Sequence, residues 1–358
     1  MHRLRRLSRR LFLCFLSDEF VMTKNNRVRQ FKLQCLALLA FGLCSGAFAA
    51  QSSTVQCPSD NFADFVKEFS SKPEVQQAFI ASPVIVQTVV FTESKPRVVE
   101  RKSRVLDLPS LVMLAPDSIA KSGLSMQVQL PNHIVVRDYN GEVLNIFTFK
   151  HNDCWVLTRA EDWSLEAVLD AQYPNLKASP GERALKRGAI YNHLGIDTES
   201  SSSSQLYISA LNSYLHGADQ GSAEAAFAAA GISLSGQAPR LENVKILQLL
   251  ESAAKSVPEA GIALADFYCD EGNYEEKRAC VNPEKSLGAL VSSAWLGSPS
   301  AFIQLGGAYE TGAIIPSDLA RAMACYQEAD KKGNEAGARG VERLSIQGIT
   351  ANNSIHCL

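Results

Sequence analysis

Three short stretches of the sequence carry the residue types of a serine acyl-transfer site. Ser118-Ile119-Ala120-Lys121 places a lysine one helical turn after a serine, where an amine can deprotonate a hydroxyl. Ser59-Asp60-Asn61 matches a second motif of such enzymes, S-D-N, and Lys121-Ser122-Gly123 resembles the third, K-T-G. Their order along the chain is wrong, and Lys121 would have to serve two motifs that need separate elements. We therefore interpret the three matches as chance and predict no enzyme.

Other catalytic signatures are missing from the sequence. The run from Gly231 to Gly236 misses the nucleophile elbow by one residue, and there is no H-E-x-x-H, G-x-G-x-x-G or P-loop. No C-x-x-C pair or close Cys/His set offers a zinc site. The sequence thus predicts no cofactor and no metal, while catalysis by dispersed residues stays open as an alternative.

The cysteines point to oxidative chemistry instead. Of nine, Cys14, Cys35 and Cys44 precede residue 50, and an even number remains. An even set in an exported chain suggests disulfides, whose pairing the sequence alone does not fix. Cys269 and Cys280 flank one loop, which favours their pairing. The remaining cysteines are then left as one pair within each domain, Cys57 with Cys154 and Cys325 with Cys357.

The N-terminus is typical of a secretory signal. Basic residues from Lys24 to Lys32 precede an apolar run over residues 33–48, which ends in the small-x-small triplet Ala47-Phe48-Ala49. We expect residues 1–49 to be a leader and signal peptide cleaved after Ala49. Either Met22 is the true start, or residues 1–21 are a long basic flank of the signal. Lipid attachment at Cys44 is a weaker alternative, because the residues before it do not match. The expected location is the periplasm or the outside of the cell.

Loss of residues 1–49 makes the chain acidic. The remainder carries 26 basic and 35 acidic residues, a formal charge of −9. Such a charge argues against nucleic acid as a partner, because phosphate contacts need clustered cations. No later apolar stretch reaches the length of a membrane span, so no stable membrane insertion is expected after signal cleavage.

Residues 55–170 predict an α+β domain of two helices followed by an antiparallel meander. Helical spacing marks Asn61–Phe69 and Glu74–Ile80, and Asn140-Gly141 between apolar runs predicts a hairpin. The order of elements is similar to the NTF2-like cone, which implies a pocket. The alternative function, a small-molecule-binding protein or enzyme, would use polar side chains inside that cone, and the candidates are His133, Arg137, Asp138 and Trp155. The expected strands are 84–91, 97–106, 126–130, 133–138, 143–150 and 154–159.

Residues 179–345 contain a repeated phrase with a small residue at its anchor. The anchors Ala225, Ala260, Ala301 and Gly337 are separated by the length of two short helices and two turns. The unit from Ala301 to Gly333 is the clearest, and the units before Ala260 are degenerate. Residues 346–358 form a tail. An all-α solenoid of stacked helix pairs is therefore expected after the α+β domain.

The clearest unit closely resembles the Sel1-like repeat. It has Ala-x3-Leu-Gly-x2-Tyr-x2-Gly, an acidic residue, then Ala-x3-Tyr-x2-Ala and Gly. Small side chains allow neighbouring helices to approach, large ones fill the space between them, and two glycines end helices where a positive φ is needed. Trp295 falls near the aromatic position of a second helix and is expected to be structural. The repeat-structural residues are Ala260, Tyr268, Ala301, Leu305, Gly306, Tyr309, Gly312, Ala322, Tyr326 and Gly333.

The resemblance implies a protein-protein interaction scaffold. Sel1-like proteins hold protein partners, and some exported members neutralise toxins, so an adaptor or an immunity-like inhibitor is the expected role. Contact residues are expected at outward positions of the first helix of each unit, at Asp266, Phe302 and Glu310. The partner is predicted to be another protein of unknown identity.

Overall fold

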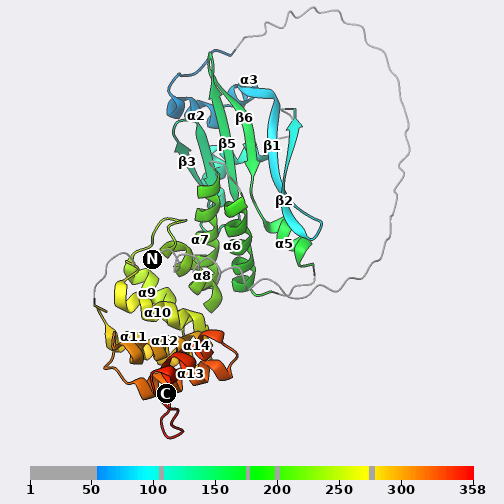
Figure 1. The fold of residues 1–358 in the computed structure, drawn as a ribbon. Helices are drawn as coiled ribbons and strands as arrows, with labels where there is room; N and C mark the ends of the chain where they lie inside the picture. The colour runs from blue at the N-terminus through cyan, green and yellow to red at the C-terminus, as the bar shows by residue number, and fades with distance from the viewer. Residues whose placement is uncertain (1–54, 105–108, 175–177, 198–201, 274–278) are drawn as a thin grey trace, which may run out of the picture. The chain divides into compact units, whose positions relative to one another are not determined.

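The computed structural model describes residues 55–104, 109–174, 178–197, 202–273 and 279–358 (Figure 1), and the predicted leader lies outside these ranges. A mixed sheet with its covering helices comes first in the chain, and α-helices alone follow from residue 180. The first part contains α2 (Phe62–Ser71), α3 (Pro73–Ala78), β1 (Ile80–Thr92), β2 (Lys95–Ser103), η3 (Pro109–Leu114), α4 (Pro116–Ser122), β3 (Ser125–Gln129), β4 (His133–Arg137), β5 (Leu144–His151), β6 (Trp155–Asp162) and α5 (Glu166–Gln172).

The sheet has six strands in the order β2-β1-β6-β5-β4-β3. Strands β3 to β6 form the expected antiparallel meander, and Gly141, with φ 72°, lies in the turn between β4 and β5. The expectation of a purely antiparallel sheet is wrong, because β1 pairs with β6 in parallel while β2 pairs with β1 as a hairpin. Long-range parallel pairing leaves no turn signal in the sequence, which is why local patterns did not indicate it.

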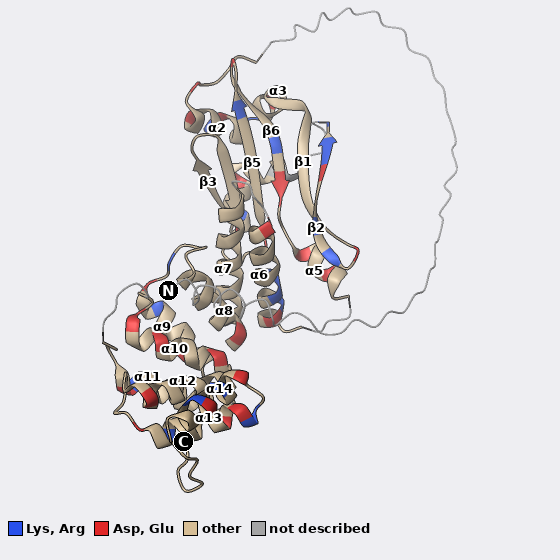
Figure 2. Ribbon diagram, viewed as in Figure 1, with Lys and Arg blue, Asp and Glu red and all other residues tan. Residues whose placement is uncertain are grey.

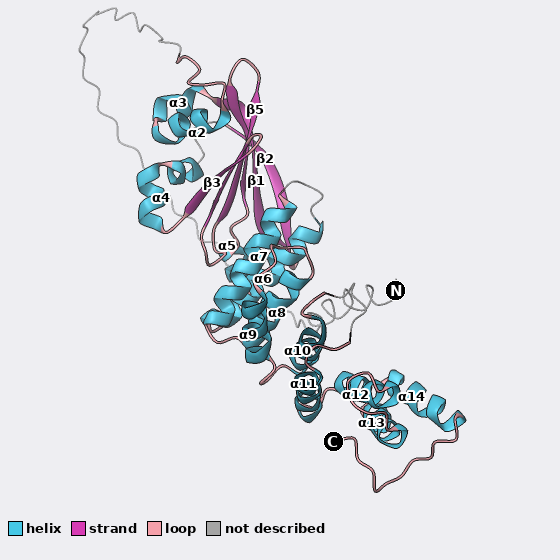
Figure 3. Ribbon diagram, turned by 90° about the vertical axis from the view of Figure 1, so that its left-hand side faces the viewer, coloured by secondary structure: helices cyan, strands magenta, loops and turns pink. Residues whose placement is uncertain are grey.

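One face of the sheet is covered by α2, α3, η3 and α4 (Figure 3). Helix α2 begins where the Asn61 side chain accepts a hydrogen bond from the Asp64 amide, at 3.2 Å. Its phenylalanines recur at helical spacing and contact the ring of Phe149, with centroids 5.2 Å apart for Phe69. The Cys57–Cys154 disulfide ties the segment before α2 to the start of β6.

The opposite face of the sheet packs against helices. Strand β4 alternates, so that Ile134 and Val136 face the α2 side while Val135 joins the other core. That second core also contains Leu144 and Ile146 of β5, and it continues into the helices beyond residue 180. One hydrophobic core is therefore shared by the two predicted parts, residues 55–170 and residues 179–345.

The second part of the chain consists of paired helices. Their lengths and the turns between them match the expected helix-turn-helix units. They are α6 (Pro180–Asp197), α7 (Ser203–Asp219), α8 (Ala223–Leu234), α9 (Asn243–Ala253), α10 (Pro258–Asp270), α11 (Pro283–Trp295), α12 (Pro299–Thr311), α13 (Leu319–Lys331) and α14 (Glu335–Ile346).

The repeat anchors occupy the same position in their respective helices, the third residue after the N-cap. Ala225 and Ala301 follow the N-caps Ser222 and Ser298, whose side chains accept hydrogen bonds from the two anchor amides. Both anchor side chains are fully buried, where a larger side chain would separate the helices. The expected end of the first helix is also found, because Gly312 has φ 72° at the C-cap of α12.

The pair α6–α7 is a further unit, which the sequence pattern indicated only in degenerate form and without its first helix. A Cβ added to Gly188 of α6 would lie 2.4 Å from the ring of Tyr214 in α7, and one added to Gly306 of α12 would lie 2.6 Å from the ring of Tyr326 in α13. The same contact between a glycine and a tyrosine therefore joins both helix pairs. At the positions of Ala301 and Leu305, however, α6 has Arg183 and Arg187, which is why the pattern is degenerate there.

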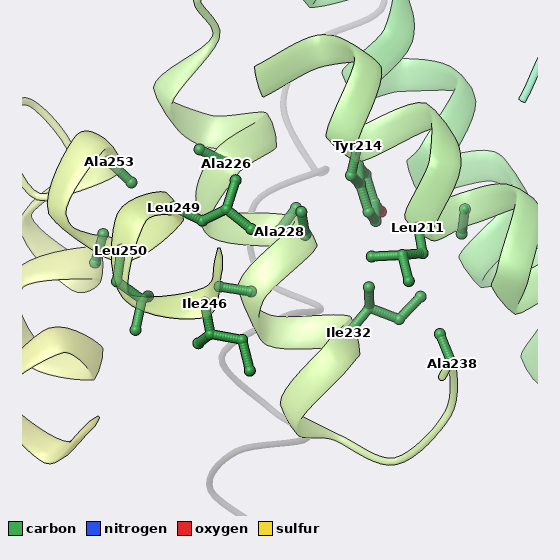
Figure 4. Close-up of a cluster of buried hydrophobic side chains, with 14 of the residues drawn as sticks. Leu211, Tyr214, Ala226, Ala228, Ile232, Ala238, Ile246, Leu249, Leu250 and Ala253 are labelled. Carbon is green, nitrogen blue, oxygen red and sulfur yellow. The ribbon is translucent and has the colours of Figure 1, made fainter. Parts of the chain in front are cut away.

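Apolar side chains hold successive pairs together. Figure 4 shows Tyr214 and Leu211 of α7 near Ile232 of α8, with Ile246 and Leu249 of α9 on the other side of α8. No single pair encloses this cluster, because its members come from three helices. Each unit thus depends on its neighbour for burial of its apolar face.

Candidate protein-binding surface

Glu310, one of the expected contact residues, is engaged inside the array. Its carboxylate accepts a hydrogen bond from the Tyr326 hydroxyl at 2.7 Å and another from the Arg343 Nε at 3.0 Å. The bond from Arg343 is the main reason why the pKa of Glu310 is lowered. The side chain joins α12, α13 and α14, so the structure gives it a role in holding the repeats together.

Phe302 was expected at an outward position and is instead buried, with 5% of its surface exposed. It lies in the continuous core of the array, and the Lys332 ammonium is 5.8 Å from its ring centroid. The expectation failed because α12 is apolar around much of its circumference, so helical spacing alone did not separate the inner face from the outer one.

Asp266 of α10 is exposed to water, yet protein surrounds it on its other sides. This loss of solvent, with a smaller repulsion from Asp270, raises the pKa of the Asp266 carboxyl to about 6. Of the three expected contact residues, Asp266 is the one that the structure leaves at the surface. A carboxylate in a crowded surface position is suited to pair with a cation of a partner.

We expect Asp266→Asn to stabilise the chain at about pH 7.5 but not at about pH 4. A carboxyl whose pKa is higher in the folded state binds more protons there than in the unfolded state, where the value is 3.8. Stability contributed by the protonated form is therefore lost as the pH rises from the lower value to the higher one. Urea unfolding of both proteins at the two pH values measures this. A variant less stable at both values would contradict it.

Trp295 is the main departure from the expected repeat. It ends α11 with 73% of its surface exposed, and Leu296 beside it is 42% exposed. The expected structural role for this tryptophan is therefore wrong. Ser298 and Asn334 donate equivalent backbone bonds to Ser293 and Ala329, and this equivalence places Leu290, not Trp295, at the position of Tyr326.

Leu290 explains a second departure. The position that Gly306 has in α12 is occupied by Ala265 in α10, and both Ala265 and Leu290 are buried. A leucine at the facing position leaves room for a methyl group, whereas a tyrosine ring requires glycine. Leu290 thus fills the space between the helices, and Trp295 is not needed for their packing. The spacing of five residues between Leu290 and Trp295 was the signal in the sequence that we missed.

The four residues expected inside a cone do not converge there. Phe62, Phe65, Phe147 and Phe149 fill the face under α2, and each is buried. Trp155 lies at its border and donates its indole N–H to the Asp60 carbonyl at 2.8 Å. That face is packed with apolar side chains.

His133 and Arg137 of β4 belong to the other face, and Asp138 follows the strand. Arg137 is buried and donates a hydrogen bond to the Gln205 side chain of α7, and burial lowers the pKa of its guanidinium. Asp138 accepts bonds from the amides of Glu142 and Val143 in the next turn, at 2.9 and 3.1 Å. His133 lines a hollow of about 40 Å³, which is too small for an organic substrate.

The serine motifs are dispersed. Ser118 and Lys121 lie on the short helix α4, while Asn61 caps α2. Within the described ranges there is no group of three or more His, Cys, Asp or Glu side chains that could hold a metal ion. The geometry thus assembles no catalytic constellation from the residues that the motifs suggested.

The six cysteines within the described residues form three disulfides. Cys269 and Cys280 are joined across the turn after α10, and Cys325 of α13 is joined to Cys357 in the tail. The third disulfide joins Cys57 to Cys154. Three disulfides are typical of proteins in oxidising compartments. Among the described helices, none combines the length and apolar character needed to cross a bilayer.

No protein-family model and no curated protein matches the sequence. Among solved structures, the chain is similar to a protective antigen of uropathogenic Escherichia coli with an SLR fold, at 19% identity and a TM-score of 0.42. That alignment covers 51% of this chain and 37% of the antigen. A Sel1 repeat protein from Oxalobacter formigenes is similar at 18% identity and a TM-score of 0.41, over 52% of this chain and 76% of the other.

The repeat assignment rests on this chain's own helices. Their lengths, their serine caps and the Gly–Tyr contact recur from one pair to another. The residue pattern of α12 and α13 resembles that of the Sel1-like repeat. Together these features show that the helices from Pro180 to Ile346 form an all-α array of stacked helix pairs with Sel1-like features.

Proposed function

We propose that this chain is an exported scaffold that binds a protein partner through its helical array, as an adaptor or an inhibitor. The observation that carries the proposal is the exposure of Trp295 and Leu296 at the end of α11. Tryptophan is enriched among the residues that dominate binding energy at protein interfaces. An immunity-like inhibitor of a secreted toxin is one form that such a scaffold takes.

Two further features support a binding role. The array is built from stacked pairs whose interior is filled by small and large apolar side chains, which leaves the outer surface free to vary. Of the candidates for chemistry in the sheet, Trp155 packs against the apolar core under α2, while Arg137 and Asp138 are bonded to a neighbouring side chain and to backbone amides. The periplasm is the proposed compartment, supported by the disulfides and by the predicted signal peptide.

Capture of periplasmic partners tests this function, with the tagged mature chain beginning at Ala50 as bait. The expected result is one specific protein that is retained by the native bait and released by Trp295→Ala. Truncation of the array is unsuitable as the comparison, because it would uncover Val135 and Ile146 on the sheet. A side chain that is 73% exposed can be removed with little effect on folding.

Tyr139→Ala is the matched control, because this aromatic side chain is 79% exposed in the turn between β4 and β5. It should retain the partner as well as the native chain does. Equal retention by the Trp295→Ala bait would remove that residue as the anchor. If no protein is enriched by any bait, the scaffold proposal loses its basis.

A further inference from the structure

Strand β2 is an edge of the sheet. Its nine residues pair with β1 in one antiparallel register from Lys95 to Ser103, and no second strand pairs with it among the residues the structure describes. Alternate N–H and C=O groups of an edge strand point away from its neighbour and remain available to another chain. Eight of the nine side chains are at least partly exposed, so neither face of the strand is fully covered.

The strand is strongly basic in an otherwise acidic chain. Residues 95–104 contain five Lys and Arg and one Glu, a formal charge of +4, against −9 for the chain after residue 49. Figure 2 shows blue segments on β2. Arg97 is paired with Glu93, but four cations have no ion pair within the described part of the molecule: Lys95, Arg101, Lys102 and Arg104.

The exposed strand also carries apolar surface at its centre. Val98 and Val99 are 39% and 42% exposed, and they point to opposite faces of the sheet. An added strand would place its own side chains beside both. Glu100, the one acidic residue, is already paired with Arg159 of β6, so it does not cancel the free cations.

We propose that β2 accepts an extended acidic segment of a partner protein as an added strand. Main-chain hydrogen bonds to the free edge would provide the affinity, and the unpaired cations would select a segment rich in Asp and Glu. This site is separate from Trp295 in the proposed function, because it lies on the sheet and uses a different mode of recognition.

The same charges argue against a second copy of this chain as the occupant. Two β2 strands paired edge to edge would bring Arg101 and Lys102 of each copy close to the cations of the other. Like charges on neighbouring strands are destabilising, and basic edges commonly prevent self-association. The charge pattern therefore argues against a second copy of this chain at β2 and favours an acidic segment of another protein.

Binding of a synthetic peptide to the full mature chain tests the proposal. The probe is a fluorescent peptide as long as β2, with alternating Glu and Val and capped ends, and binding is followed by anisotropy. The double variant Arg101→Glu with Lys102→Glu should weaken binding by about tenfold or more. Raising the salt concentration from about 50 mM to about 500 mM should weaken it as well.

The control variant Lys121→Glu with Lys150→Glu makes the same change of net charge at exposed positions on α4 and β5. It should bind like the native chain. Two further peptides carry N-methyl groups, one on the odd-numbered residues and one on the even-numbered residues. Each keeps the charge of the probe but lacks the amide donors along one edge, so at least one of the two peptides should fail to bind. Equal binding by both methylated peptides, or equal weakening by both double variants, would overturn strand addition, as would sedimentation of the free chain as a dimer.

Discussion

Replacement of Cys57 and Cys154 together by alanine is expected to lower the free energy of unfolding by about 4.7 kcal/mol, the largest loss among the three disulfides. The bond closes a loop of 97 residues that includes β1 to β5. In the chain-entropy model, a cross-link stabilises the fold by restricting the unfolded chain, and the effect grows with the logarithm of the loop length.

The two other disulfides provide the scale. Cys325 and Cys357 are 32 residues apart, for which the same model gives about 3.7 kcal/mol. Cys269 and Cys280 are 11 residues apart, for which it gives about 2.8 kcal/mol. Urea unfolding of the three double variants measures the order directly.

Each variant removes both sulfurs of a pair, so no free thiol remains to exchange. Cys57 and Cys154 join the segment before α2 to β6, and their loss should affect the sheet before the array. A reversed order of the three losses would contradict the entropic explanation. Equal stability of all variants and the native chain would show that the cross-links do not limit the unfolded state.

Gly306→Ala is expected to destabilise the chain by about 2 kcal/mol, although alanine is the better helix former. A Cβ at this position would lie 2.6 to 2.9 Å from three carbons of the Tyr326 ring. The ring cannot move away easily, because its hydroxyl is bonded to Glu310 and its body is buried. Helices α12 and α13 would have to separate.

Gly307→Ala is the matched control in the same helix. Its Cβ would have only the Tyr326 hydroxyl within 4 Å, at 3.8 Å, which is an ordinary contact. The substitution should therefore stabilise the chain by up to about 1 kcal/mol through helix propensity. Thermal and urea unfolding of both variants give the comparison, and a Gly306→Ala chain as stable as Gly307→Ala would refute the close-packing argument.

Several elements were predictable because their signals are local. The strands from β1 to β6 each overlap an expected β-rich segment, and Asn140-Gly141 marked the hairpin between β4 and β5. The repeat was visible because a close helix contact demands a small side chain at a fixed position, as at Ala301 and Gly306. The helices α4 and α5 were not expected, because α4 buries no residue and α5 buries only the adjacent Val168 and Leu169, so neither shows an apolar period.

The α6–α7 pair shows how substitutions at key positions hide a repeat. Arg187 takes the place that leucine has in α12, and a charged residue there does not suggest a buried position. In the structure its guanidinium pairs with Glu142 at 3.3 Å and also with Glu166, so the charge is compensated by residues distant in sequence. Such compensation is a tertiary property.

By itself, the sequence determined the α+β class of the first part and the all-α class of the second, the acidic charge of the chain after residue 49, and the small and large residues of the repeat. Only the tertiary structure decided that β1 lies parallel to β6, that Phe302 is buried while Trp295 is exposed, and that β2 is an edge. The physical reason is the range of the interactions. Turns, caps and helix contacts depend on residues close in sequence, whereas strand order and the buried side of a helix depend on what packs against them from elsewhere in the chain.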